Sequence, residues 1–270
     1  MSFLERIPRR IIFLTLIIVV VVPILSPFPL PVPITKNTRN YYNIIEALEP
    51  GSVVFYGTSV ETRDIEAYPQ HVATLKHLKE KKAIVITYCF GAGTALGQEW
   101  VYEDAGYDEL EYGTDYVHLG FVPGGDATLT AFCNDMVATK QVDHYGNPTA
   151  TMPIFQKVKT IHDVDLVIAS GGGTPGPDTY ARIVVIPYDK VSIVQVPGAM
   201  AAMVYDFINL KVFRGGVIAQ RGAVEYEAIT GHAGRATTTF APIFISSIVL
   251  ILLMIFGNIA YVSNRMKEGQ

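Results

Sequence analysis

Glycine-rich turns with hydroxyl or carboxylate neighbours are the parts of this sequence that could do chemistry. Glycine lets backbone N–H groups approach an anion closely, and neighbouring polar side chains can orient a ligand. The predicted cleft contains Thr58, Ser59, Gly91, Gly93, Gly124, Gly125, Asp126, Ser170, Gly171, Gly172, Gly173 and Asp178. In it, amides of residues 171–173 would bind a small anionic ligand, and Asp126 or Asp178 would contact its polar groups. Glycine is equally suited to ordinary short strand-to-helix turns, so that interpretation stays open.

Four residues placed directly after predicted strands are candidate nucleophiles: Thr58, Ser59, Cys89 and Ser170. A nucleophile needs a base, and no G-x-S-x-G elbow supplies the usual context. His71 and His77 are six residues apart, which does not match a helical i, i+4 metal pair, and His118 is expected in the core. His144, in a long loop, is expected to be solvated. The sequence thus predicts no metal site and no cofactor, and it favours a protein that is not an enzyme without deciding the matter.

The elements that would position these residues alternate between strand-like and helical patterns. Short apolar runs predict strands at 52–56, 83–88, 116–122, 165–169 and 191–196. Helices are predicted at 64–80, 94–105, 127–137 and 199–210. The stretch 180–187 is ambiguous between strand and helix, and we assign it to a helix because the strand–helix alternation then stays unbroken. This alternation indicates one α/β domain over residues 45–230, with a doubly wound, mainly parallel, Rossmann-like sheet of about five strands. Because ligands bind at the carboxyl ends of such strands, the turns named above should share one edge.

Two features of the domain leave alternatives open. The glycine-rich stretch 215–222 could pack on a neighbouring subunit or fold back on its own domain. Cys89 and Cys133 could form a disulfide in an oxidising compartment, but we expect two separate buried thiols.

The apolar excess of the chain lies at its two ends. The sequence is 50% hydrophobic and 17% charged, and no charged residue occurs within 11–35 or 240–262. These runs predict transmembrane helices at 8–26 and 240–262, because about 20 apolar residues span a bilayer. A proline-rich extended linker (27–44), a second linker (231–239) and a short tail (263–270) complete the chain. The first run could instead be a signal peptide, but no A-x-A-like site follows it.

Charge placement predicts how the chain crosses the lipid bilayer. Five basic residues lie between the two runs and the chain termini: Arg6, Arg9, Arg10, Arg265 and Lys267. Three lie on the domain side: Lys36, Arg39 and Arg235. The excess favours a two-pass cell-membrane protein with both termini cytoplasmic, residues 1–7 included, and an extracytoplasmic domain, with a cytoplasmic domain as the alternative. The net charge of −4 argues against nucleic acid as a partner.

Four motifs in a fixed order carry a family resemblance. They are Y-G-x-D-Y-V-x-L-G at 112–120, P-G-G at 123–125, D-x-D-L-V at 163–167 and R-G-A-V-E-Y-E at 221–227. Over most of residues 45–230 the chain resembles a family of uncharacterised prokaryotic membrane-anchored α/β-domain proteins with no assigned activity. The resemblance implies an α/β domain tethered to a membrane and implies no site residue.

The sequence therefore supports two hypotheses of function. The first is a membrane-anchored, self-associating domain, a homo-oligomeric scaffold of a membrane assembly. It rests on the 15 tyrosines, the low charge and the missing catalytic constellation. The second is a ligand-binding or hydrolytic domain with its site at the glycine-rich strand ends.

Overall fold

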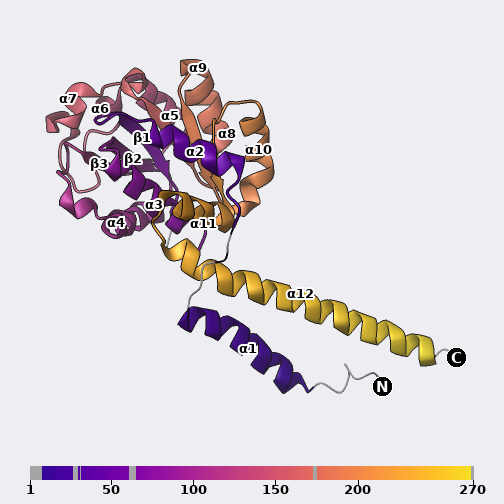
Figure 1. The fold of residues 1–270 in the computed structure, drawn as a ribbon. Coiled ribbons are helices and arrows are strands. Elements are labelled where there is room, and N and C mark those ends of the chain that lie inside the picture. The colour runs from indigo at the N-terminus through magenta and orange to yellow at the C-terminus, as the bar shows by residue number, and fades with distance from the viewer. Residues whose placement is uncertain (1–7, 27–29, 31, 61–64, 173–174, 269–270) are drawn as a thin grey trace. The chain divides into compact units, whose positions relative to one another are not determined.

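The computed structural model describes residues 8–26, 30, 32–60, 65–172 and 175–268 (Figure 1). Its internal contacts divide the chain into two units. One unit is Val32–Ala236, called the domain below, and the other combines Met1–Pro31 with Thr237–Gln270. The domain therefore begins before the predicted residue 45.

Six parallel strands form the single sheet of the domain. They are β1 (Val53–Thr58), β2 (Ile84–Cys89), β3 (Tyr116–Phe121), β4 (Leu166–Ser170), β5 (Ser192–Val196) and β6 (Gly216–Ile218). Their order across the sheet is β3-β2-β1-β4-β5-β6. The predicted parallel α/β architecture is confirmed, with one strand more than expected. That extra strand, β6, lies within the glycine-rich stretch 215–222, which folds back on its own domain and pairs with β5.

Helices cover both faces of this sheet. The longer ones are α2 (Lys36–Glu46), α3 (Ala67–Glu80), α4 (Ala92–Ala105), α5 (Gly125–Asn134), α10 (Ala201–Asn209) and α11 (Ala219–Thr230). Single turns are α6 (Met136–Thr139), α7 (Ile154–Lys157), η2 (Tyr107–Glu109), η3 (Thr149–Thr151), η4 (Ile161–Asp163) and η6 (Gly198–Met200). The segment predicted as a helix at 180–187 is helical, as α8 (Pro177–Tyr180), the π-helical η5 (Ala181–Val185) and α9 (Ile186–Tyr188).

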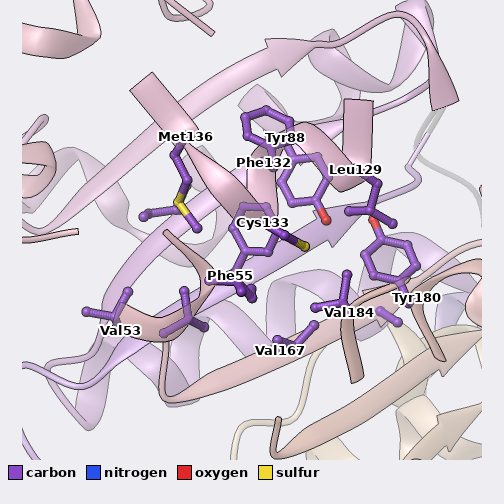
Figure 2. Close-up of a cluster of buried hydrophobic side chains, with 14 of the residues drawn as sticks. Val53, Phe55, Tyr88, Leu129, Phe132, Cys133, Met136, Val167, Tyr180 and Val184 are labelled. Atoms are coloured by element: carbon purple, nitrogen blue, oxygen red, sulfur yellow. The ribbon is translucent and has the colours of Figure 1, made fainter. Parts of the chain in front are cut away.

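Alternate residues of β1 enter two different cores, because successive strand side chains point to opposite faces. Phe55 packs with Tyr88 and Phe132 in the core beneath α5, α8 and α10, shown in Figure 2. Tyr56 enters the other core, beneath α2, α3, α4 and α11, together with Tyr41. All six β1 residues are buried, as expected for a strand covered on both sides.

The predicted extended linker 27–44 is wrong over its second half, where α2 forms. Thr35 caps this helix by accepting a hydrogen bond from the Thr38 N–H, and Tyr41 and Ile45 are fully buried. The side chains at 38, 41 and 45 share one face of a helix, so packing on the domain stabilises a short helix that its composition alone does not. The predicted linker 231–239 is likewise shortened, because the last helix starts at Arg235.

The end segments are both helical where the structure describes them. Helix α12 (Arg235–Glu268) contains the stretch Arg235–Ile259, which is long and apolar enough to cross a membrane. Helix α1 (Arg9–Leu25) is apolar but has 17 residues, about 26 Å at 1.5 Å per residue. Among the described residues one helix, rather than the predicted two, therefore meets the length required for a span.

Candidate functional site

The connections of the sheet change direction between β1 and β4. Strand β1 pairs with β2 on one side and with β4 on the other. The chain leaves β1 into α3 on one face and leaves β4 into α8 on the opposite face. Connections that diverge in this way open the position at which ligands bind in doubly wound sheets. Thr58 ends β1, and Ser170 ends β4.

A hydrogen-bonded series of polar side chains lies where β1 and β4 end. The Ser170 Oγ is 3.3 Å from the Ser59 Oγ, 3.1 Å from His71 Nε2 and 2.7 Å from the Gly57 carbonyl oxygen. Ser170 and His71 are buried, with 3% and 1% of their surface exposed, whereas Ser59 is partly exposed. One hydroxyl hydrogen on Ser170 thus faces three acceptors, and only rotation about the Cβ–Oγ bond is needed to redirect it.

The backbone of α3 sets the protonation pattern of His71. Its Nδ1 lies 2.8 Å from the Ala67 carbonyl oxygen, which can only accept a hydrogen bond. Nδ1 therefore carries a hydrogen, and in the neutral form of the ring Nε2 is an acceptor that faces Ser170. The Tyr56 ring stacks on the imidazole at 5.3 Å with an interplanar angle of 10°. His71 is thus fixed both in tautomer and in orientation.

A second polar network holds α3 against the ends of β5 and β6. Gln195 accepts the Tyr56 hydroxyl and donates through Nε2 to Thr74 Oγ1 at 2.5 Å and to the Gln70 carbonyl at 3.0 Å. Gln70 Nε2 donates to the carbonyls of Val196 and Ala219 at 3.3 and 2.9 Å. Gln70 Oε1 is buried without a hydrogen-bond partner among the described residues. This edge of the sheet therefore retains an unused buried acceptor.

The packing of Tyr180 against β1 requires glycine at residue 57. A Cβ at this position would lie 1.8 Å from the Tyr180 hydroxyl oxygen. Tyr180 is fully buried in the core beneath α8. The absence of a side chain at residue 57 thus lets Tyr180 of α8 pack against β1.

Only part of the predicted cleft comes together at the ends of β1 and β4. Thr58, Ser59 and Ser170 do, and Gly171 and Gly172 follow Ser170 directly. Gly91 caps α4, and Gly93 lies in its first turn, after β2; Gly124, Gly125 and Asp126 begin α5 after β3. Those turns are one and two strands away, at about 4.8 Å per strand.

Two of the groups predicted to contact the ligand already have partners within the protein. The Gly171 N–H already donates to the Gln195 carbonyl at 3.1 Å. Asp126 pairs with Arg182 at 2.6 Å on the surface, and Asp178 lies in the first turn of α8. Gly173 lies outside the described residues.

The remaining histidine and cysteine predictions have clear outcomes. His118 is a fully buried core residue of β3, as predicted, and burial lowers its pKa to about 3. His144 is not fully solvated, because it bonds Glu99 at 2.9 Å and is half-buried against His118. Cys89 and Cys133 are separate buried thiols, as predicted. In the part of the chain that the structure covers, no group of three or more potential metal ligands occurs.

Sequence reasoning named both serines but missed His71. His71 lies 99 positions before Ser170, so no local sequence pattern connects the two residues. It is also one of many buried residues of α3, and its spacing to the other histidines matches no known motif. The one local feature of His71 is its contact with Ala67, four residues earlier. Every helix contains pairs of residues at this spacing, so the spacing does not distinguish His71.

No protein-family model matches the chain, and no curated protein was found to be similar to it.

Proposed function

We propose that this is a membrane-tethered domain that binds a small, uncharged, polar ligand where β1 and β4 end. The observation that carries the proposal is the hydrogen-bonded series Ser59–Ser170–His71 at the end of these two strands. Hydroxyl and imidazole groups both donate and accept, which suits a ligand with hydroxyl, amide or ester groups. The unpartnered Gln70 Oε1 at the same edge offers one more acceptor.

The charges at this edge favour an uncharged ligand over the anionic one expected from the sequence. The Glu66 carboxylate, just before α3, accepts the Gly198 N–H at 2.8 Å. Its negative charge opposes a phosphate or carboxylate nearby. The Gly171 amide, which an anion would need, is already engaged.

Membrane tethering is the second part of the proposal. Helix α12 has the length and composition of a span, and α1 could span a bilayer of about 30 Å with local thinning or with flanking residues added. With both helices inserted, the chain is a two-pass cell-membrane protein with cytoplasmic termini and an extracytoplasmic domain. Protease added outside intact cells would then cut the domain, and complete protection would contradict this orientation.

Self-association as a homo-oligomeric scaffold is the competing function. It would need a contiguous apolar face. The most exposed apolar side chains of the described domain are distributed over several elements: Leu96 on α4, Ile186 on α9, Tyr205 and Leu210 on and at the end of α10, Ile65 before α3, and Val142 and Tyr145 in a loop. Light scattering of the detergent-extracted protein decides this point, since a monomer contradicts the scaffold.

Thermal unfolding in the presence of candidate ligands tests the binding site. The full chain in detergent is screened against neutral sugars, polyols, amides and esters, with inorganic phosphate and acetate as anionic comparisons. A ligand at 100 times its Kd stabilises by about 2.7 kcal/mol, or roughly 5–10 °C for a domain of this size.

Two serine variants locate the effect. Ser170→Ala should abolish the ligand-induced shift. Ser192→Ala should keep it, because Ser192 is an equally buried serine in the neighbouring strand whose hydroxyl donates to Val212 at the opposite, amino-terminal end. A shift that survives Ser170→Ala would contradict this location.

A further inference from the structure

The contacts of Ser59, Ser170 and His71 form one hydrogen-bonded series. Ser59 lies at the outer end of this series and is partly exposed. His71 lies at the inner end, with 1% of its surface exposed. Ser170 connects them, at 3.3 Å from the Ser59 Oγ and 3.1 Å from His71 Nε2. Both steps are within the reach of a proton transfer between heteroatoms after slight tightening.

The base at the inner end is oriented in the way that nucleophilic catalysis requires. A nucleophile, a base in hydrogen-bond reach and a third group that orients the base are the parts of such a site. Here the Ala67 carbonyl oxygen is the third group, since it holds the Nδ1 hydrogen of His71 at 2.8 Å. The stacked Tyr56 ring fixes the plane of the imidazole.

Only a torsion separates the observed arrangement from a working relay. The Ser170 hydroxyl hydrogen has its shortest contact with the Gly57 carbonyl, at 2.7 Å. Rotation about its Cβ–Oγ bond turns that hydrogen to His71 Nε2 and turns a lone pair to Ser59 without moving any heavy atom. Ser59 can then donate to Ser170 while Ser170 donates to His71.

We propose that Ser59 is the nucleophile of an acyl-transfer site that cleaves uncharged carboxylic esters, with Ser170 and His71 as its proton relay. This inference rests on the proposed ligand site and adds a reaction to it. Ser59 Oγ bonds to the ester carbonyl carbon, its proton passes to Ser170, and the Ser170 proton passes to His71 Nε2. Collapse of the adduct breaks the ester C–O bond, and the same relay returns a proton to the departing alcohol. Water then repeats the sequence, which releases the acid and restores Ser59.

An uncharged ester fits the site better than a phosphate ester. The Glu66 carboxylate contacts this edge through the Gly198 N–H, and its negative charge disfavours an anionic substrate. The hydroxyl groups of Ser59 and Ser170 are neutral, so they offer no charge that an ionic substrate would need as a partner.

Covalent labelling of the full chain with a fluorophosphonate tests the nucleophile. Attack by Ser59 forms a P–O bond and breaks the P–F bond, with loss of fluoride. Trypsin separates the candidates, since Ser59 lies in peptide 40–63 and Ser170 in peptide 160–182. We expect the adduct on peptide 40–63 of the wild type and no adduct there in Ser59→Ala, which still contains Ser52.

Matched variants test the relay. His71→Gln and Ser170→Ala should each slow labelling at least 100-fold, the lower end of the range for general base catalysis. His77→Gln and Ser192→Ala should label at the wild-type rate. His77 is the other fully buried histidine of α3 and bonds Tyr226 and Glu46 instead. Ser170→Thr keeps the hydroxyl and should restore the labelling that Ser170→Ala loses. If the role of Ser170 were purely structural, the labelling rate would not depend on its hydroxyl group.

Three results would overturn the inference. They are a folded wild type that takes no label, an adduct on peptide 160–182 in place of 40–63, and an unchanged rate in His71→Gln. Ligand-induced stabilisation without any labelling would leave the binding site standing and would overturn only the acyl transfer.

Discussion

Replacement of Glu225 by alanine should destabilise the domain more than most single substitutions. The Glu225 carboxylate on α11 is 1% exposed, and one of its oxygens, Oε2, accepts three hydrogen bonds from the start of α2. The donors are the Thr35 N–H at 2.9 Å, the Thr35 hydroxyl at 2.7 Å and the Thr38 hydroxyl at 2.7 Å. Arg221 Nε donates to the other oxygen at 2.9 Å. This carboxylate therefore joins α2 to α11.

The magnitude follows from those contacts. A hydrogen bond to a charged group contributes about 1.5 kcal/mol or more, so the three bonds from α2 contribute about 4–5 kcal/mol. A cavity of about 80 Å³ beside Thr35, Thr38 and Glu225 can admit water to the vacated donors. We therefore expect a net loss near 3 kcal/mol for Glu225→Ala, or roughly 6–12 °C in the midpoint of thermal unfolding.

Circular dichroism of the detergent-solubilised full chain measures that midpoint. Glu109→Ala is the matched control, because this carboxylate also has a basic partner, Lys79 at 2.6 Å, but is 72% exposed. It should show no measurable shift, since exposed ion pairs are screened by solvent. Hydrogen exchange should also rise at residues 35–46 in Glu225→Ala alone. If Glu225→Ala unfolds within 2 °C of the wild type, the carboxylate does not hold α2 and the reasoning is refuted.

Three further results are expected. Gly57→Ala should destabilise the domain by about 1–3 kcal/mol in chemical denaturation, because its Cβ would overlap the Tyr180 hydroxyl oxygen, and Tyr180→Phe should recover part of the loss; independent effects would contradict this contact. Because burial lowers the pKa of His118 to about 3, the unfolded chain binds the extra proton between pH 6.5 and 3, so stability should fall with falling pH there and the fall should be smaller in His118→Asn. Burial raises the pKa values of Cys89 and Cys133 to about 12 and 11, so a thiol reagent at pH 8 should react only as the protein unfolds, and fast native labelling would contradict their burial.

The amino-acid sequence by itself determined the class of the fold and most of its elements. Strands β1 to β5 are mostly apolar runs, and such runs identify strands covered on both faces without any knowledge of their neighbours. The charge-free ends are equally local features, and each contains a helix, α1 to Leu25 in the first and α12 in the second. The hydroxyl residues of the candidate site, Ser59 and Ser170, were also predicted because each directly follows a strand.

Tertiary structure alone decided the order of the strands and the partner of Ser170. The ends of β1 and β4 lie side by side because β4 pairs with β1 and not with β3. This pairing brings His71 to Ser170 across 99 residues, and no local pattern encodes that distance. Strand β6, with three residues, and helix α2 have too little local preference to form alone. They form because β5 offers an open edge and α11 offers the buried carboxylate of Glu225.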